Sequence, residues 1–246
     1  MCELFGVSSS IPRGLTRWLT TFRARGGAAA DNPDGWGVAY WLGGSPKIEK
    51  SPEPGWDSAH FLRVSENLVS DLVIAHVRKA RHPPVPSLEN THPFVHLCCG
   101  RAWIFAHNGL VADVFDQPLA DSSYSPLGAT DSEFAFCQLL AGIAGSYSRD
   151  DQQRWLHVLN RLADAIASLG KFNFLLSDGR ILIAYGHDRL HYLESSVDYS
   201  RCALVATEPL DDGAWQPFAA QELRVYQDGA LVASHAPHGD TQHSPT

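Results

Sequence analysis

The sequence predicts an α+β protein built of stacked layers, and three observations support that fold class. Most apolar residues gather in short runs rich in Val, Trp and Tyr that are flanked by Gly, Pro and Asn, as in buried strands. Longer stretches carry apolar residues at every third or fourth position, which indicates helices. Because strands follow strands and helices follow helices, stacked layers fit better than a doubly wound parallel sheet, in which the two alternate.

The predicted strands begin near the amino terminus and extend over most of the chain. Short runs at residues 4–8 and 35–42 come first. Further runs of the same kind lie at residues 72–77, 102–106, 172–176, 181–185, 190–193, 203–206 and 223–226. The protein is therefore expected to consist mostly of sheet.

The predicted helices lie at residues 15–25, 59–68, 132–143 and 152–169. Thr130 and Asp131 can cap the third of them. Residues 81–93 are rich in Pro and polar residues and predict a loop, whereas residues 234–246 lack apolar periodicity and predict a mobile tail. We therefore expect one domain over residues 2–233.

The composition of the chain bounds its class and its partners. A length of 246 residues is within the range of one large layered domain, and a hydrophobic fraction of 44% allows a sizeable core. Nineteen basic against 27 acidic residues give a formal charge of −8. This sign is wrong for a protein that neutralises the phosphates of a duplex or an anionic bilayer. Neither nucleic acid nor a membrane is therefore expected as a partner.

The sequence also indicates the cellular setting. No apolar run approaches the ~20 residues of a membrane-spanning helix, and the first residues lack the pattern of a signal peptide. A cytoplasmic protein is therefore expected. Five cysteines with irregular spacing do not suggest a disulfide framework, so free thiols are predicted.

Cys2 directly follows the initiator methionine. Because a small second residue permits removal of Met1, the mature chain would carry a free α-amine beside its own thiol. Such an amine titrates near ~7.7–8.0, so that at neutral pH part of it can take the thiol proton. The alternative is that Cys2 is a small buried residue ahead of a strand, and neighbouring motifs must decide between the two.

Four further motifs accompany Cys2. They are HVR at residues 76–78, NTHP at 90–93, HNG at 107–109 and TDSE at 130–133. In this order they resemble the class II glutamine amidotransferase family. The runs CELFG at residues 2–6, NPDGWG at 32–37, NTHPF at 90–94 and ATEPL at 206–210 resemble its stand-alone bacterial members, which are related to γ-glutamyl hydrolases. The resemblance implies a four-layer αββα sandwich of the N-terminal-nucleophile (Ntn) hydrolase type.

The resemblance also implies the catalytic residues. Cys2 would be the nucleophile, while the Asn108 amide and the Gly109 main-chain N–H would form an oxyanion hole. A missing Cβ at Gly109 would let the substrate approach the chain. By local sequence alone, an Asn-Gly hairpin turn is the competing interpretation.

The same comparison implies substrate-binding roles. The planar guanidinium of Arg78 would bind the substrate α-carboxylate, and Asp131 would accept from the α-ammonium. A surface salt bridge is the alternative for Arg78, and the helix cap is the alternative for Asp131. His92 and His107 would support the pocket without direct catalysis.

Several residues fall outside these roles. The NPDGWG run is interpreted as scaffold, with Trp36 packing nearby. Arg81 stands where relatives usually carry a smaller Thr, and it could alter the pocket mouth and favour an anionic leaving group. The adjacent pair Cys98 and Cys99 lacks the two-residue gap that lets two thiolates share a tetrahedral zinc, so a metal site is not expected. No phosphate-cradling glycine motif is present, and no cofactor is expected.

The function expected from these residues is hydrolysis of the γ-glutamyl amide of glutamine or a related small molecule through the Cys2 thiol. Water is the default acceptor, because no synthetase motif appears in the chain. Two alternatives remain open. One is a catalytically silent module that binds γ-glutamyl ligands, and the other is a glutaminase subunit that delivers ammonia to a separate synthetase chain.

Overall fold

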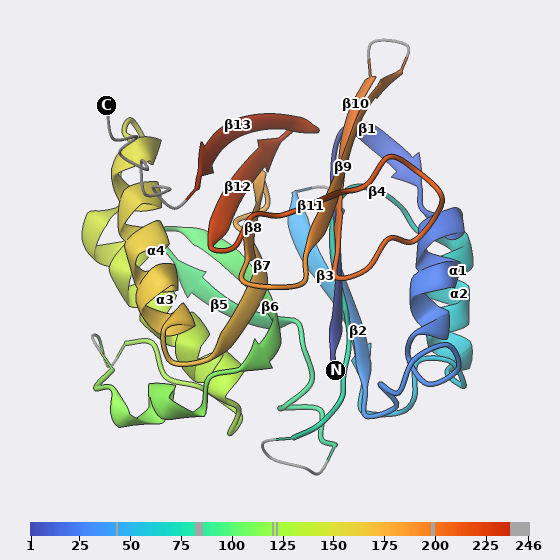
Figure 1. Cartoon of the computed structure of the whole chain (residues 1–246), viewed down its shortest axis with the longest axis horizontal. Helices are drawn as coiled ribbons and strands as arrows, with labels where there is room; N and C mark the ends of the chain where they lie inside the picture. Colours follow the sequence, from blue (N-terminus) through green and yellow to red (C-terminus); the bar gives the residue numbers. More distant parts are fainter. Residues whose placement is uncertain (43, 82–85, 120, 122, 198–199, 237–246) are drawn as a thin grey trace, which may run out of the picture.

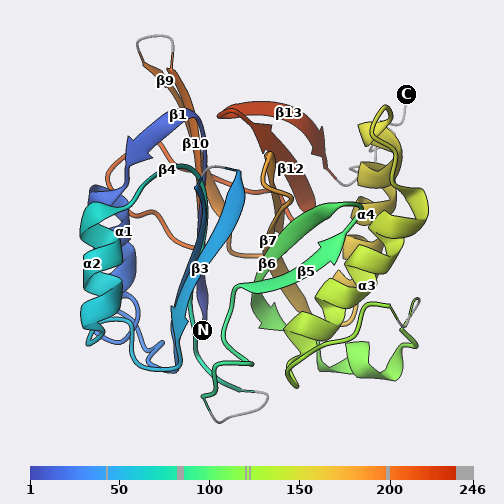
Figure 2. The same ribbon diagram turned by 180° about the vertical axis from the view of Figure 1, so that it is seen from behind.

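The computed structural model has four layers, with two β-sheets packed face to face between two pairs of helices (Figure 1). The structure describes all residues except 43, 82–85, 120, 122, 198–199 and 237–246. Figure 2 shows the same layers from behind, in the reverse order. The stacked α+β layers expected from the sequence are confirmed.

All strand pairs in both sheets are antiparallel. The seven-stranded sheet has the order β11 (Gln216–Pro217), β9 (His191–Val197), β10 (Ser200–Ala206), β1 (Glu3–Gly14), β4 (Val69–Val77), β2 (Trp36–Leu42) and β3 (Ser45–Ser51). The six-stranded sheet has the order β13 (Ala230–His235), β12 (Glu222–Gln227), β8 (Ile181–Gly186), β7 (Lys171–Ser177), β6 (Arg101–Leu110) and β5 (Phe94–Cys98).

The helices cover the outer faces of the two sheets. Helices α1 (Thr16–Ala24) and α2 (Ala59–Asn67) lie on the seven-stranded sheet, and α3 (Asp131–Ser146) and α4 (Gln152–Ala167) lie on the six-stranded sheet (Figure 1). A short 3-10 helix, η1 (Ala112–Asp116), follows β6. None of the described helices is long and apolar enough to cross a membrane.

Alternating side chains of the central strands fill three separate layers of core. On β1, Leu4 packs in the cluster between the sheets, whereas Phe5 packs in the cluster under α1 and α2. On β6, Ile104 faces the other sheet and Phe105 faces α3 and α4. Because successive side chains of a strand point to opposite faces, both faces of such a strand must be apolar, as the continuous apolar runs in the sequence indicated.

Some elements were not predicted from the sequence. The edge strand β3 has only one large apolar residue, Ile48, among polar and charged ones, so it lacks the pattern of a buried strand. The short strands β5 and β13 and the 3-10 helix η1 were also missed. Strand β13 runs through Ser234 and His235, which were expected in the mobile tail, and residues 237–246 lie outside the described part of the chain.

The antiparallel registers bring distant parts of the sequence to one end of the sandwich. Glu3 pairs with Val77, so the start of β1 lies beside the end of β4. In the other sheet, Gly109 near the end of β6 pairs with Phe172 at the start of β7. The residues that precede β1, follow β4 and end β6 therefore meet at the same end of the two sheets.

Candidate active site

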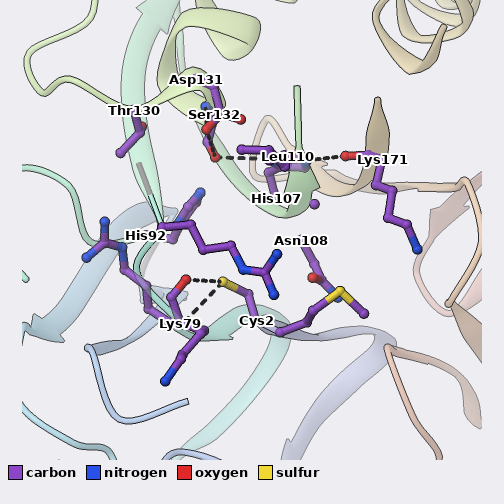
Figure 3. A pocket seen from close by; sticks show the side chains of 14 residues that line it. Cys2, Lys79, His92, His107, Asn108, Leu110, Thr130, Asp131, Ser132 and Lys171 are labelled. Carbon is purple, nitrogen blue, oxygen red and sulfur yellow. Dashed lines mark hydrogen bonds between the residues drawn. The ribbon is translucent and has the colours of Figure 1, made fainter. Parts of the chain in front are cut away.

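A small pocket of about 70 Å³ lies at this end of the sandwich, between the two sheets. It is lined by all seven residues that the sequence assigned to a site: Cys2, Arg78, His92, His107, Asn108, Gly109 and Asp131. Cys2 directly precedes β1, Arg78 directly follows β4 and His92 lies in the loop before β5. The other four lie near the end of β6 and at the start of α3, and Figure 3 shows side chains that line the pocket. The sequence did not anticipate that Lys79, Ser132 and Lys171 would also line the pocket.

Cys2 lies with its sulfur against the main chain that follows β4. The Lys79 N–H donates to the Cys2 Sγ over 3.2 Å, and the Sγ lies 3.5 Å from the Lys79 oxygen (Figure 3). Burial raises the pKa of the thiol, although the Lys79 N–H and the charge of Arg78 act in the opposite direction. The thiol is therefore protonated at neutral pH, and attack by its sulfur requires a base.

The main chain at Arg78 is fixed by the glycine-rich turn, which is formed by the NPDGWG run at residues 32–37. Asp34 N donates to the Arg78 oxygen over 2.9 Å, and Arg78 N donates to the Gly35 oxygen over 2.8 Å. The Asp34 carboxylate accepts from Ala80 N over 2.8 Å. Arg78 is buried, with only 3% of the residue exposed, so the alternative of a surface salt bridge is wrong.

The same run also lies in close contact with the loop that carries His92. A Cβ on Gly37 would collide with the main-chain oxygen of His92. Trp36 stacks on Phe61, with 4.4 Å between the ring centroids, and anchors the turn under α2. These contacts agree with the interpretation of the NPDGWG run as scaffold.

Asn108 and Gly109 lie within β6, where they pair with Asn173 and Phe172 of β7, so the alternative of a hairpin turn is wrong. The Asn108 Nδ2 donates to the Thr207 Oγ1 over 3.2 Å. A Cβ on Gly109 would collide with the Lys171 oxygen of the neighbouring strand. The close pairing of β6 with β7 thus requires a glycine at this position. The sequence had suggested a different reason for the glycine, namely the approach of substrate.

Asp131 is the first residue of α3 and does not cap it. Thr130 is the cap, because its Oγ1 accepts from Glu133 N over 3.1 Å. One oxygen of the buried Asp131 carboxylate accepts from Val111 N over 2.7 Å, and the other accepts from Ser132 N over 2.8 Å. A carboxylate has about four acceptor positions, so capacity for a further donor remains.

Buried imidazoles form the wall behind these residues. The His107 Nδ1 lies 2.8 Å from the Ser132 Oγ, and the Nε2 lies 3.1 Å from the Lys171 oxygen (Figure 3). A carbonyl can only accept, so the proton is on Nε2 and the Ser132 hydroxyl donates to Nδ1. The His92 ring packs on His76 with 4.1 Å between centroids. Burial lowers the pKa of all three histidines, which are therefore neutral at pH 7.

The other cysteines lie away from this pocket. Cys98 ends β5, and its Sγ lies 2.8 Å from the Cys99 Sγ in the hairpin that leads to β6. Within the described residues, no group of three or more His, Cys, Asp or Glu side chains is arranged to hold a metal ion. All five cysteines are free.

Comparison with known proteins agrees with the family that the motif order resembles. Residues 1–204 match the family model of the class II glutamine amidotransferases. The chain belongs to this family. The four-layer sandwich is accordingly the Ntn-hydrolase fold that the resemblance implied.

Two relatives and one crystal structure illustrate how far the similarity extends. The Escherichia coli protein YafJ, named as a glutamine amidotransferase, is 32% identical over 94% of this chain and 100% of its own. A γ-glutamyl-hercynylcysteine sulfoxide hydrolase of Mycobacterium tuberculosis is 29% identical over 82% of this chain and 79% of its own. The crystal structure of a predicted glutamine amidotransferase from Pseudomonas aeruginosa is 30% identical over 94% of this chain and 100% of its own, with a TM-score of 0.69.

Proposed function

We propose that this class II glutamine amidotransferase cleaves the γ-glutamyl amide of a small molecule through the thiol of Cys2. The observation that carries the proposal is the convergence on one pocket of a half-buried thiol, an amide donor, a guanidinium and a carboxylate, supplied by Cys2, Asn108, Arg78 and Asp131. Each is the group that one step of amide cleavage needs, and they come from four separate segments of the chain.

The chemistry follows from these groups. The Cys2 sulfur attacks the amide carbon, and the thiol proton passes to the leaving nitrogen as the carbon–nitrogen bond breaks. The base for this transfer is the α-amine of Cys2. This amine is free only after removal of Met1, because until then the Cys2 nitrogen is part of a peptide bond and cannot accept the proton. Water then attacks the resulting thioester, which releases glutamate and restores the thiol.

Charge development in this reaction is matched by the pocket. The negative oxygen of the tetrahedral intermediate would accept from Asn108 Nδ2 and Gly109 N, which are fixed within β6. Arg78 and Asp131 would bind the two charges on the glutamyl α-carbon and hold its side chain towards Cys2. His76, His92 and His107 are neutral, so they present no positive charge that competes with Arg78 for the carboxylate.

The acceptor is proposed to be water. Similarity to a hydrolase of a γ-glutamyl compound over 82% of this chain supports this reading. The five free cysteines support the expected reducing, cytoplasmic setting. Delivery of ammonia to a separate synthetase and silent γ-glutamyl binding are the outcomes that the experiment must exclude.

The test is a mass-spectrometric assay of glutamate release from glutamine and from larger γ-glutamyl compounds. Wild-type protein should release glutamate, and Cys2→Ser should nearly abolish release because a neutral hydroxyl is a poor nucleophile. Cys99→Ser, a change at a free thiol in the distant hairpin, is the matched control and should retain activity. Binding without release in the wild type would instead support a silent module.

A further inference from the structure

Thr207 lies immediately after β10 and is completely buried. Its Oγ1 accepts from Leu4 N over 2.9 Å and from Asn108 Nδ2 over 3.2 Å. Its own N–H donates to the Leu4 oxygen over 3.0 Å. One hydroxyl therefore joins the strand that begins beside Cys2, in one sheet, to the amide of Asn108, in the other.

The hydrogen-bonding capacity of these groups determines what the contact does. A threonine hydroxyl has two acceptor lone pairs, and the two N–H donors of Leu4 and Asn108 occupy both. The Asn108 amide has two N–H groups, so the bond to Thr207 uses one and leaves the other for the pocket. An amide turned by 180° would instead present its oxygen to the developing oxyanion, which would repel it.

The main chain of Asn108 is held by a different residue. Asn173 Nδ2 donates to the Asn108 oxygen over 3.1 Å, and Asn173 Oδ1 accepts from His187 N over 2.8 Å. The strand position of Asn108 is thus fixed through β7 and does not depend on the Thr207 hydroxyl. Loss of that hydroxyl would therefore act mainly on the orientation of the Asn108 side chain.

We propose that Thr207 is a positioning residue that orients the Asn108 amide towards the oxyanion. Its hydroxyl also holds this amide in a fixed position relative to β1, the strand that follows Cys2. This inference rests on the proposed amide cleavage and adds to it a residue outside the four catalytic and binding groups. A positioning role predicts a loss in kcat with little change in KM, because the oxyanion exists only during the reaction.

The first experiment compares substitutions at Thr207 in the full-length processed protein. Thr207→Val keeps the shape and removes the hydroxyl, and it should lower kcat by about 10–100-fold, less than the ~10²–10³-fold loss for an oxyanion donor itself. KM should stay within about twofold. Thr207→Ser restores the hydroxyl and should recover most of kcat. Ser65→Ala, which removes a buried hydroxyl in α2, is the control and should leave kcat unchanged.

If Thr207→Val does not fold, Thr207→Cys provides the same comparison, since a thiol is a much weaker acceptor than a hydroxyl. Its kcat should then be several-fold below that of Thr207→Ser. Equal kcat for the two folded variants would overturn the inference.

The second experiment asks whether Thr207 acts through Asn108. In an Asn108→Ala background, Thr207→Val should have little further effect on kcat, because the side chain that it orients is gone. The same fold-loss in both backgrounds would overturn the inference and point to a general effect on the Cys2 strand. Absence of turnover in the wild type would contradict the proposed function itself, whereas an active wild type with an unaffected Thr207→Val variant would contradict only the inference.

Discussion

The Nε2 of His76 lies 3.2 Å from the main-chain oxygen of His107. This contact joins β4 of one sheet to β6 of the other directly behind Arg78 and Asn108. Both imidazoles are buried, and burial, together with the nearby charge of Arg78, lowers the pKa of His76 to about 3. The site therefore rests on uncharged imidazoles. Protonation of His76 would place a second positive charge beside Arg78.

A dependence of stability on pH follows from this burial. Between about pH 6.5 and pH 3, His76 binds a proton in the unfolded chain but not in the folded one, so its contribution to the free energy of unfolding decreases as the pH falls. The slope from one such group approaches ~1.4 kcal/mol per pH unit. His76→Gln, which retains an N–H donor, should make the measured slope shallower by up to this amount.

The measurement is urea unfolding of both proteins at several values between about pH 6 and pH 4. His157→Gln, on the exposed side of α4, controls for the loss of one imidazole. Identical slopes for wild type and His76→Gln would show that His76 is not responsible.

The apolar patterns predicted the layered fold because both faces of the central strands are buried, as at Leu4 and Phe5. The edge strand β3 was not predicted, because it is held by main-chain pairing with β2 and has few apolar side chains to form a recognisable pattern. The seven residues that the motif order singled out all line one pocket, since each motif lies at a strand end or at the start of a helix. Their roles in catalysis and binding stay predictions.

The contacts that orient those residues could not be predicted, because they depend on register between distant segments. The bond from Asn108 to Thr207 spans 99 positions in the chain, and the link from Cys2 to Lys79 spans 77. Local sequence was also misleading at Gly109, where an Asn-Gly pair typical of a turn lies within a strand.

Removal of Met1 is the second prediction. Met1 lines the pocket beside Cys2, and while it is attached the Cys2 nitrogen is an amide without basic character. Burial raises the pKa of the thiol, so turnover at neutral pH needs the free amine as base. Intact-mass measurement of active protein should therefore show the chain without Met1. Full activity in a preparation that retains Met1 would remove the amine from the mechanism.

The third prediction separates binding from chemistry. Arg78→Lys should mainly raise KM, because an ammonium cannot form the two parallel bonds of a guanidinium to a carboxylate. Asp131→Asn should act similarly through the substrate ammonium. Asn108→Ala should instead lower kcat by ~10²–10³-fold. Steady-state kinetics with one γ-glutamyl substrate tests all three changes, and an unchanged kcat for Asn108→Ala would place the oxyanion hole elsewhere.

The last prediction concerns the leaving group. Beside Arg78, the cations at the pocket are Lys79, Arg81 and Lys171. Lys79 pairs with Asp31 over 2.9 Å and Lys171 pairs with Asp188 over 2.6 Å, whereas Arg81 has no ion pair with any residue that the structure describes. Arg81 is exposed, so its charge is available to an anionic group beyond the scissile amide.

We therefore expect kcat/KM for glutathione, whose leaving group carries a carboxylate, to equal or exceed that for glutamine. Arg81→Thr should lower kcat/KM for glutathione by up to ~5-fold, the range for an exposed ion pair, and leave a neutral γ-glutamyl anilide unaffected. Arg149→Thr, an exposed arginine outside this pocket, is the matched control. A large preference for glutamine that rises when a partner chain is added would instead indicate a subunit that delivers ammonia. Hydrolysis by water needs no partner, whereas a partner that consumes the ammonia released from glutamine would favour that substrate.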